Sequence, residues 1–307
     1  MTATQRHSHL IDRFDPKVLT ALSGLDLKAR YLVEGFLHGL HESPFHGLSV
    51  EFSEYRKYLP GDDLRHVDWR LFARSDRMYV KKYTQETNVR MYVVCDTSAS
   101  MGYRGRDAWG SKLEVARILA AALTSMLLGQ NDAVGMLALN EDHDSPEFIR
   151  PSQKPSQFGL MLQQLQVLRS AGGPRLAELL RHLTRLIHRR SVVLFFSDLL
   201  EPADEIAELF RELRFNGHEV LMFQILDRDE IDFPFENGRV FEDLESGVRR
   251  NINPVAVRER YLQRFNEFMA EYRELFRALE IPHCIVETDK QPWEALATFL
   301  IERKRLM

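Results

Sequence analysis

The segment RMYVVCDTSASMG, residues 90–102, determines how the rest of the chain is interpreted. Residues 91–95 are apolar and rich in β-branched and aromatic types, which predicts a strand buried on both faces. Asp96, Ser98 and Ser100 follow at two-residue spacing. Their carboxylate and hydroxyl groups supply only oxygen ligands, which suit a hard divalent cation such as magnesium, calcium or manganese. The same residue types are also common in turns that cap a helix, so the pattern alone leaves both interpretations open.

A second cap signal lies further along the chain. Ser111 is followed three residues later by Glu114 and then by a long apolar run, which is typical of a capping box. We therefore expect a helix that begins near Lys112 and carries its own cap. Because Ser98 and Ser100 are not needed to cap this helix, the capping interpretation of the first segment is weakened.

Strand-type and helix-type segments alternate through the rest of the chain. This alternation predicts an α/β fold: a doubly wound, mostly parallel sheet with helices on both faces. The segment 147–152 is expected to be an antiparallel strand. Further strands are predicted at 133–139, 191–198, 219–226 and 282–289, and helices at 157–168, 174–187, 205–218 and 291–306.

The residues before and after this alternation predict additional elements. Asp15-Pro16 indicates a helix to about Leu22, and Asp26 is predicted to cap a second helix. A densely charged block from Tyr55 to Lys82 is expected to form a strand, a turn, a short helix and a return strand, with no role that the residues reveal. The predicted division is an N-terminal helical arm (1–45), the charged strand-turn-helix-strand block (46–88) and the α/β domain (89–307).

Near the C-terminal end, residues 239–247 alternate between apolar and polar types and predict a short hairpin arm. Asn253-Pro254 then starts a long helix. Its apolar stripe is expected to pack on the sheet. The stripe consists of Val257, Tyr261, Phe265, Phe268, Tyr272, Leu275 and Leu279.

Composition excludes several classes of function. The chain has 307 residues and a net charge of −4, with basic and acidic residues spread throughout, so no footprint for nucleic acid is present. No apolar run approaches the roughly 20 residues that span a bilayer, so membrane insertion is not expected. The first 15 residues lack the apolar core of a secretory signal. Cys95 and Cys284 are expected to be buried thiols, and we expect a soluble protein of the reducing cytoplasm.

A second strand also ends in polar residues. Residues 191–198 are predicted to form a continuous buried strand that ends in Ser197-Asp198. In open α/β sheets, ligands bind outside the carboxyl ends of strands where the strand order reverses. If the two strands are neighbours at that point, Asp198 joins Asp96, Ser98 and Ser100 in one cluster.

The motifs together resemble a known family. DTSAS after a buried strand, with Ser-Asp after a later one, resembles the metal-ion-dependent adhesion site (MIDAS) of von Willebrand factor A domains. The segment YLPGDDLRHVDWRLFARSDRMYVKKY, residues 58–83, followed by DTSASMG, resembles the DUF 58 family of prokaryotic proteins with that fold. The resemblance runs from about Ser43 to the C-terminus. It implies a von Willebrand A-like, Rossmann-type fold with Asp96, Ser98, Ser100 and Asp198 as ligands of Mg²⁺, or of Mn²⁺ or Ca²⁺.

One position departs from the family pattern. Sites of this type use a threonine in a Gly-Gly-Thr loop, whereas this chain has Gly172-Gly173-Pro174. Proline has no side-chain oxygen, so only water or a neighbour such as Ser170 could replace that ligand. Occupancy by a metal therefore stays open at this stage.

The resemblance implies a non-catalytic interaction or assembly module that works with a MoxR-type AAA+ ATPase and binds a partner's acidic side chain through the cation. One alternative is a metal-free structural module with a vestigial site. The other is a metal-dependent phosphohydrolase with Asp96 as nucleophile. The second alternative is weaker, because Ser98 stands where such enzymes carry a second aspartate, and neither a phosphate-binding glycine loop nor a G-x-S-x-G motif occurs. No catalytic residue is predicted.

Overall fold

The body of the molecule is a six-stranded sheet in the order β10-β7-β6-β3-β4-β5. The computed structural model describes residues 24–42, 55–57, 79–81, 90–139, 146–172, 176–236, 239–292, 295–297 and 299. Neighbouring strands of the sheet are parallel except β4 and β5, which are antiparallel as predicted. The strands are β3 (Arg90–Cys95), β4 (Ala133–Ala138), β5 (Glu147–Ser152), β6 (Ser191–Ser197), β7 (Glu219–Leu226) and β10 (His283–Glu287).

The strand order reverses at β3. The chain continues from β3 to β4 on one side and later returns to β6 on the other side. In register, Cys95 lies beside both Ala138 of β4 and Phe196 of β6. The polar residues that follow β3 and β6 therefore leave the sheet side by side, at the edge where α/β sheets bind ligands.

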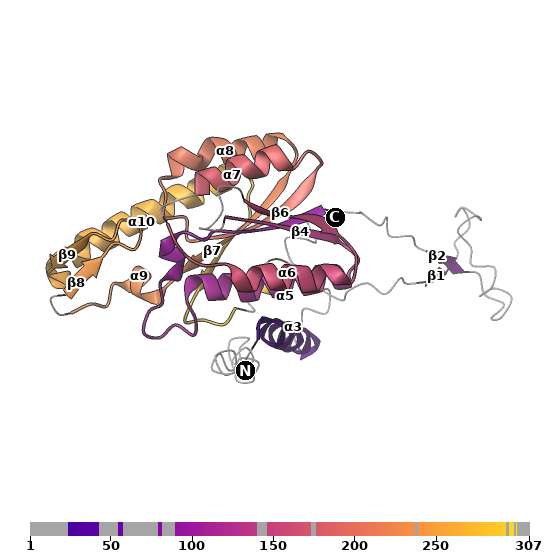
Figure 1. The fold of residues 1–307 in the computed structure, drawn as a ribbon, viewed down its shortest axis with the longest axis horizontal. Coiled ribbons are helices and arrows are strands. Elements are labelled where there is room, and N and C mark those ends of the chain that lie inside the picture. Colours follow the sequence, from indigo (N-terminus) through magenta and orange to yellow (C-terminus); the bar gives the residue numbers. More distant parts are fainter. Residues whose placement is uncertain are drawn as a thin grey trace.

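Helices cover both faces of the sheet, as predicted (Figure 1). On β3, Met91, Val93 and Cys95 face the core formed with α3, α5 and α6, whereas Tyr92 and Val94 face the core formed with α7, α8 and α10. This division explains why β3 is apolar at every position from 91 to 95. The helices are α3 (Leu25–Glu42), α5 (Lys112–Gly129), α6 (Ser156–Val167), α7 (Leu176–Leu186), α8 (Ala203–Phe215) and α10 (Pro254–Ala278).

The first described helix, α3, packs on the body. Leu25, Ala29 and Leu32 are buried in the same core as residues of α5. The prediction that Asp26 caps this helix is wrong, because the helix begins at Leu25 and Asp26 lies in its first turn. There its charge is favourable near the positive end of the helix dipole. The helix predicted from Asp15 lies outside the described residues.

The charged block is described only at two short strands. β1 (Tyr55–Lys57) and β2 (Tyr79–Lys81) pair antiparallel, so a first strand and a return strand are present in the block as predicted. The short helix predicted between them lies outside the described residues.

The long helix α10 begins at the predicted Asn253-Pro254. Its C-terminal half buries Met269, Tyr272 and Phe276. The prediction that the whole stripe packs on the sheet is wrong for the N-terminal half, which extends beyond the sheet (Figure 1). There Tyr261 packs instead on Phe233, with ring centroids 4.5 Å apart.

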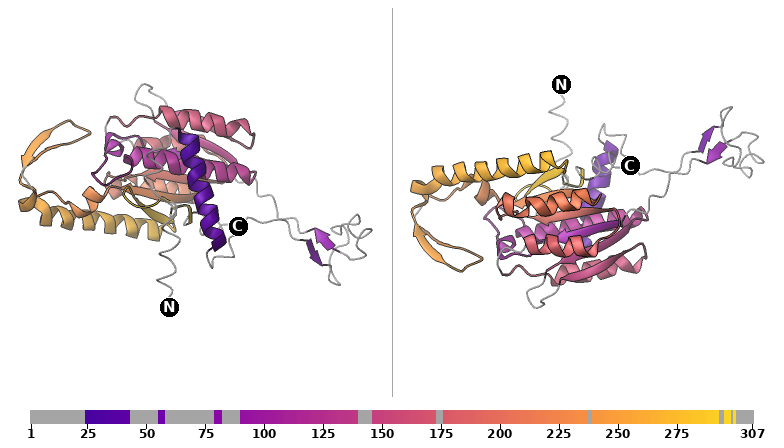
Figure 2. Two further views of the ribbon diagram at one scale, coloured as in Figure 1. Left: turned by 90° about the horizontal axis from the view of Figure 1, so that it is seen from below. Right: turned by 90° about the horizontal axis from the view of Figure 1, so that it is seen from above.

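The predicted hairpin arm is present. β8 (Arg239–Glu242) and β9 (Arg249–Ile252) pair antiparallel and lie at the outer end of α10 (Figure 2). Phe241 of β8 stacks on Phe233, with centroids 5.8 Å apart. This aromatic contact attaches the arm to the chain just after the short helix α9 (Arg228–Asp232).

Three remaining predictions concern the C-terminal part and the cysteines. Residues 295–297 and 299 are helical, and the rest of the helix predicted at 291–306 lies outside the described residues. Cys95 is buried as predicted, whereas Cys284 is partly exposed because β10 is an edge strand; neither forms a disulfide in the described part of the chain. Among the helices that the structure describes, none combines the length and apolar character needed to span a bilayer.

Candidate functional site

The site begins where β3 ends. The N–H of Asp96 still donates to the carbonyl of Phe196 (2.9 Å), so this residue leaves the sheet in contact with β6. Its Oδ1 accepts the N–H of Ser98 (2.9 Å). Its Oδ2 accepts the hydroxyl of Ser197 (2.6 Å). These bonds fix the orientation of a carboxylate that is only 5% exposed.

The two serines lie beside this carboxylate. Ser98 precedes a single 3-10 turn, Ala99–Gly102, and its side chain makes no capping hydrogen bond. Its Oγ instead lies 3.1 Å from Oγ of Ser100. The predicted capping box of Ser111 and Glu114 is present at the start of α5. The structure thus confirms that Ser98 and Ser100 are not needed to cap α5.

Asp198 joins the cluster from β6, as the neighbouring positions of the two strands require. The following residue, Leu199, has φ of +61°, a left-handed conformation that is uncommon for a non-glycine residue. The resulting sharp turn lets the N–H of Leu200 donate to Oδ1 of Asp198 (3.3 Å). The side-chain amide of Gln224 on β7 donates a hydrogen bond to the backbone carbonyl of Asp198 (3.1 Å).

A buried lysine, which the sequence interpretation missed, lies against Asp198. Nζ of Lys112 is 2.7 Å from Oδ2 of Asp198 and 2.6 Å from Oε1 of Glu230, and the lysine side chain is 0% exposed. Burial lowers the pKa of Lys112, but the two carboxylates more than offset this effect, so that the pKa lies above its usual value. The ammonium group is therefore charged and neutralises part of the acidic surroundings.

Two more carboxylates border the site and were also missed. Glu201 and Glu245 line the same shallow hollow as Asp96, Ser98, Ser100 and Asp198. Glu201 accepts the N–H of Leu176 at the start of α7 (2.6 Å). Glu201 follows Asp198 by three residues in the sequence, which could have signalled it, whereas Glu245 comes from the hairpin arm and no local spacing marks it.

The loop that departs from the family pattern is hydrogen-bonded to the turn that follows β3. Ala171 N–H donates to the carbonyl of Thr97 (2.9 Å), and Ala99 N–H donates to that of Gly172 (3.2 Å). Pro174 lies outside the described residues. Ser170, considered above as a substitute ligand, lies beside Gly102, where an added Cβ would be 2.5 Å from its Oγ. It is not among the side chains that line the hollow.

The oxygen-bearing side chains at this site are of the chemical type that binds a hard divalent cation. The predicted ligands are two carboxylates and two hydroxyls, all buried, and oxygen is the ligand atom that Mg²⁺, Mn²⁺ and Ca²⁺ prefer. The pKa of Asp96 is raised to about 6, first by burial and then by the negative charge of Asp198, so the site concentrates negative charge. Among the described residues, no group of three or more His, Cys, Asp or Glu side chains is arranged to hold a metal ion, so a cation here would depend on the serine hydroxyls.

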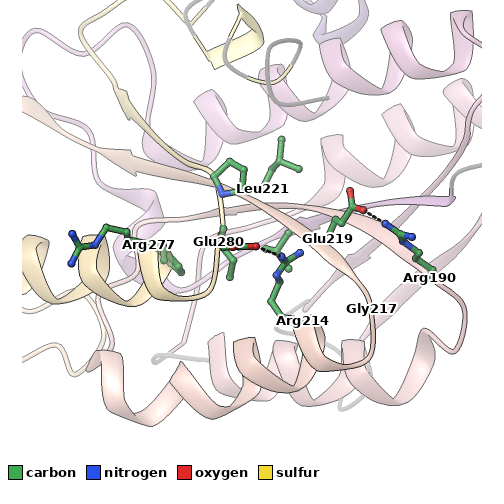
Figure 3. Close-up of a pocket in the computed structure, with 11 residues that line it drawn as sticks. Arg190, Arg214, Gly217, Glu219, Leu221, Arg277 and Glu280 are labelled. Atoms are coloured by element: carbon green, nitrogen blue, oxygen red, sulfur yellow. Dashed lines mark hydrogen bonds and ion pairs between the residues drawn. The ribbon is translucent and has the colours of Figure 1, made fainter. Parts of the chain in front are cut away.

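A second hollow lies at the opposite end of the sheet, at the start of β7 (Figure 3). Its arginines have carboxylate partners. Arg190 lies 2.6 Å from Glu219 and Arg214 lies 3.7 Å from Glu280. Paired and solvated charges of this kind offer little to a ligand, so we regard the cluster around Asp96 as the functional candidate.

The fold and the site define an α/β protein with an oxygen-rich cluster at the carboxyl edge of a mostly parallel sheet. The chain belongs to the family described as "Protein of unknown function DUF58", which matches residues 54–271. This result confirms the resemblance to the DUF 58 family. Two similar relatives are the uncharacterized proteins Rv1480 of Mycobacterium tuberculosis and Mb1516 of Mycobacterium bovis, each 29% identical over 301 residues, which cover 95% of this chain and 91% of the relative.

Solved structures with a similar arrangement are more distant. The protein BatB from Bacteroides thetaiotaomicron is 17% identical with a TM-score of 0.46, covering 71% of this chain and 100% of that one. An aerotolerance-related membrane protein from Bacteroides fragilis is 18% identical with a TM-score of 0.44, covering 70% of this chain and 99% of that one. Likeness at this level supports no conclusion about function.

Proposed function

We propose that this protein is a non-catalytic interaction or assembly module with a von Willebrand A-like fold, which captures an acidic side chain of a partner protein through a divalent cation. Asp96, Ser98, Ser100 and Asp198 are the proposed ligands of Mg²⁺ or a similar cation. An ion that these four residues do not saturate can accept one more carboxylate, so cation and carboxylate neutralise each other in the interface.

One observation carries the proposal. The Asp96 turn and Asp198 leave neighbouring parallel strands and border one hollow. Bringing these carboxylates together is costly unless positive charge accompanies them, and Lys112 supplies a single positive charge that it shares with Glu230. The remaining negative charge favours a cation.

The proposed partner is a MoxR-type AAA+ ATPase, which the family resemblance suggests. We place the interaction in the cytoplasm, an inference supported by two cysteines that form no disulfide in the described part of the chain. No nucleic-acid partner is proposed, given the net charge of −4.

The test is capture of the purified cognate MoxR-type ATPase by wild-type protein, by Asp96→Asn and by Asp107→Asn. Asp107 is exposed in the loop that follows the site, so its substitution removes the same charge without touching the cluster. We expect Asp96→Asn to weaken capture at least about 10-fold, as loss of metal-site partners does, and Asp107→Asn to bind normally. The ATPase itself needs Mg²⁺, so removing the metal with a chelator would affect both proteins. The comparison of the two variants, and not chelation, therefore tests the proposal. Equal capture by both variants would refute the proposal.

The metal-free structural module is the second candidate, because the Lys112 ammonium already contacts Asp198 at 2.7 Å. Melting of the protein with added Mg²⁺ or Mn²⁺ separates the two. A cation that binds only the folded state stabilises it by about 2.7 kcal/mol at 100 times its Kd. A melting temperature that does not respond to either ion would favour the metal-free module.

A further inference from the structure

The amino ends of β3 and β6 bring three arginines to one hollow. Arg90 is the first residue of β3 and lies beside Ser191, the first residue of β6. Arg189 and Arg190 directly precede Ser191. The three arginines line an open hollow together with residues at the start of β4 and around the end of β5. This hollow adjoins the one at the start of β7, with which it shares Arg190.

The positive charges in this hollow have few partners. Among the described residues, neither the Arg90 nor the Arg189 side chain forms an ion pair or a hydrogen bond. Arg190 lies 2.6 Å from Glu219, but its side chain is 77% exposed (Figure 3), and a solvated pair of this kind contributes little. Of the described residues that line the hollow, none is acidic. The hollow therefore carries an excess of positive charge in a chain whose net charge is −4.

The acidic cluster at the other edge of the sheet does not neutralise these arginines. Arg90 begins β3 and Asp96 follows its last residue, so the six residues of the strand separate the two edges by about 20 Å. Exposed charges are largely screened from each other beyond about 10 Å at 0.1 M salt. The repulsion among the three guanidinium groups therefore persists in the isolated protein, and a bound anion would relieve it.

The side chains in the hollow are of the type that binds oxyanions. A guanidinium group presents parallel N–H donors that match a carboxylate or a phosphate, and it stays charged at physiological pH. Docking on an anionic lipid surface also requires large apolar side chains that enter the membrane. The uncharged residues that line the hollow are Ala133, Pro151, Ser152 and Gln153. A concave surface of small and polar residues with three arginines favours an acidic protein segment over a lipid surface.

We propose that this hollow binds a carboxylate-rich segment of a partner protein through Arg90, Arg189 and Arg190. The inference goes beyond the proposed function and does not depend on it, because it concerns a different surface and needs no cation. The hollow and the Asp96 cluster lie at opposite ends of β3, so a partner at one leaves the other accessible. The protein can thus connect two partners, which suits an assembly module.

The experiment measures binding of a fluorescein-labelled hexaglutamate peptide by fluorescence anisotropy, at low and at physiological salt. The double variant Arg90→Gln/Arg189→Gln removes two arginines of the hollow. The control Arg260→Gln/Arg264→Gln removes the same charge from exposed positions of α10. We expect the hollow variant to bind the peptide at least about 10-fold more weakly than wild type, because charge-assisted hydrogen bonds from arginine are lost. The control should bind within about 2-fold of wild type, since exposed charges far from the hollow are screened.

Three outcomes would overturn the inference. The first is an equal loss of peptide affinity in both double variants, because binding would then follow the total charge and not the hollow. The second is a wild-type protein that does not bind the peptide at low salt. The third is binding of the wild type to phosphatidylserine vesicles but not to the peptide, which would assign the hollow to a lipid surface. Urea unfolding verifies that both double variants are folded, and Asp96→Asn should bind the peptide as wild type does, whatever becomes of the cation site.

Discussion

Replacing Lys112 with methionine tests whether the buried ion pair holds the site together. The ammonium group lies 2.7 Å from Asp198 and 2.6 Å from Glu230, and the side-chain exposures are 0% for Lys112, 2% for Asp198 and 19% for Glu230. Methionine keeps most of the length and apolar contact of the lysine stem. It removes the positive charge and leaves two carboxylates close together with no cation against them.

The expected loss follows from this burial. Removing one partner of a buried pair costs about 3–5 kcal/mol, because the remaining charge is left uncompensated in a region of low polarity. A surface pair costs only about 0–1 kcal/mol. Lys290, which pairs with Glu287 at 2.5 Å while its side chain is 51% exposed, provides the matched control. We therefore expect Lys112→Met to lower the free energy of unfolding by about 3–5 kcal/mol and Lys290→Met by less than about 1 kcal/mol.

Urea unfolding at pH 7 measures the free energy of unfolding of both variants. The urea midpoint should shift, while the slope of the free energy against urea concentration stays unchanged. The double variant Lys112→Met/Asp198→Asn should recover part of the loss, because the uncompensated charge at Asp198 is then gone. A loss for Lys112→Met as small as that for Lys290→Met, or no recovery in the double variant, would refute the reasoning.

Three further predictions concern stability away from the ion pair. The pKa of His283 is lowered to about 4, first by burial and then by the charge of Arg273. The unfolded chain therefore binds a proton below about pH 6.5 that the folded chain does not. His283 should thus lower stability by about 1–2 kcal/mol between pH 7 and pH 5, measured as the difference between wild type and His283→Asn in urea unfolding, because Asp96, whose pKa is raised to about 6, contributes in the opposite direction in both proteins. A Cβ added at Gly105 would lie 2.1 Å from Oδ1 of Asp227, so Gly105→Ala should lower the melting temperature, at a cost of about 1–3 kcal/mol. Gly159 of α6 has no atom within 4 Å of such a Cβ, so Gly159→Ala should instead stabilise by about 0.5–1 kcal/mol. The same pH dependence of stability in wild type and His283→Asn, or equal effects of the two alanines, would contradict these expectations.

Local patterns in the sequence predicted the elements that depend on neighbouring residues. The capping box at Ser111 and Glu114 and the helix start at Asn253-Pro254 both lie where expected. The predicted cap at Asp26 failed because that helix begins one residue earlier, at Leu25. The long stripe of α10 was misjudged in its first half because periodicity shows which side chains share a face, not what lies opposite that face.

The candidate site likewise has residues that the sequence could predict and a residue that it could not. Asp96, Ser98 and Ser100 follow a strand that is apolar from residue 91 to 95, and Asp198 follows a strand that is apolar from 192 to 196, so their convergence could be inferred once the strands were taken as neighbours. Lys112 carried no such signal, because a lysine at the first position of a helix is ordinarily exposed.

By itself, the sequence determined the α/β class, the strand ends that carry Asp96 and Asp198, and membership of the chain in its family, because short-range periodicity, caps and motif spacing are encoded in contiguous residues. Only the tertiary structure decided that Lys112 and Glu245 belong to the site. Lys112 reaches Asp198 across 86 positions, and Glu245 arrives on a hairpin whose placement depends on aromatic contacts beyond the sheet. Contacts between distant segments depend on how whole elements pack, and no local pattern records them.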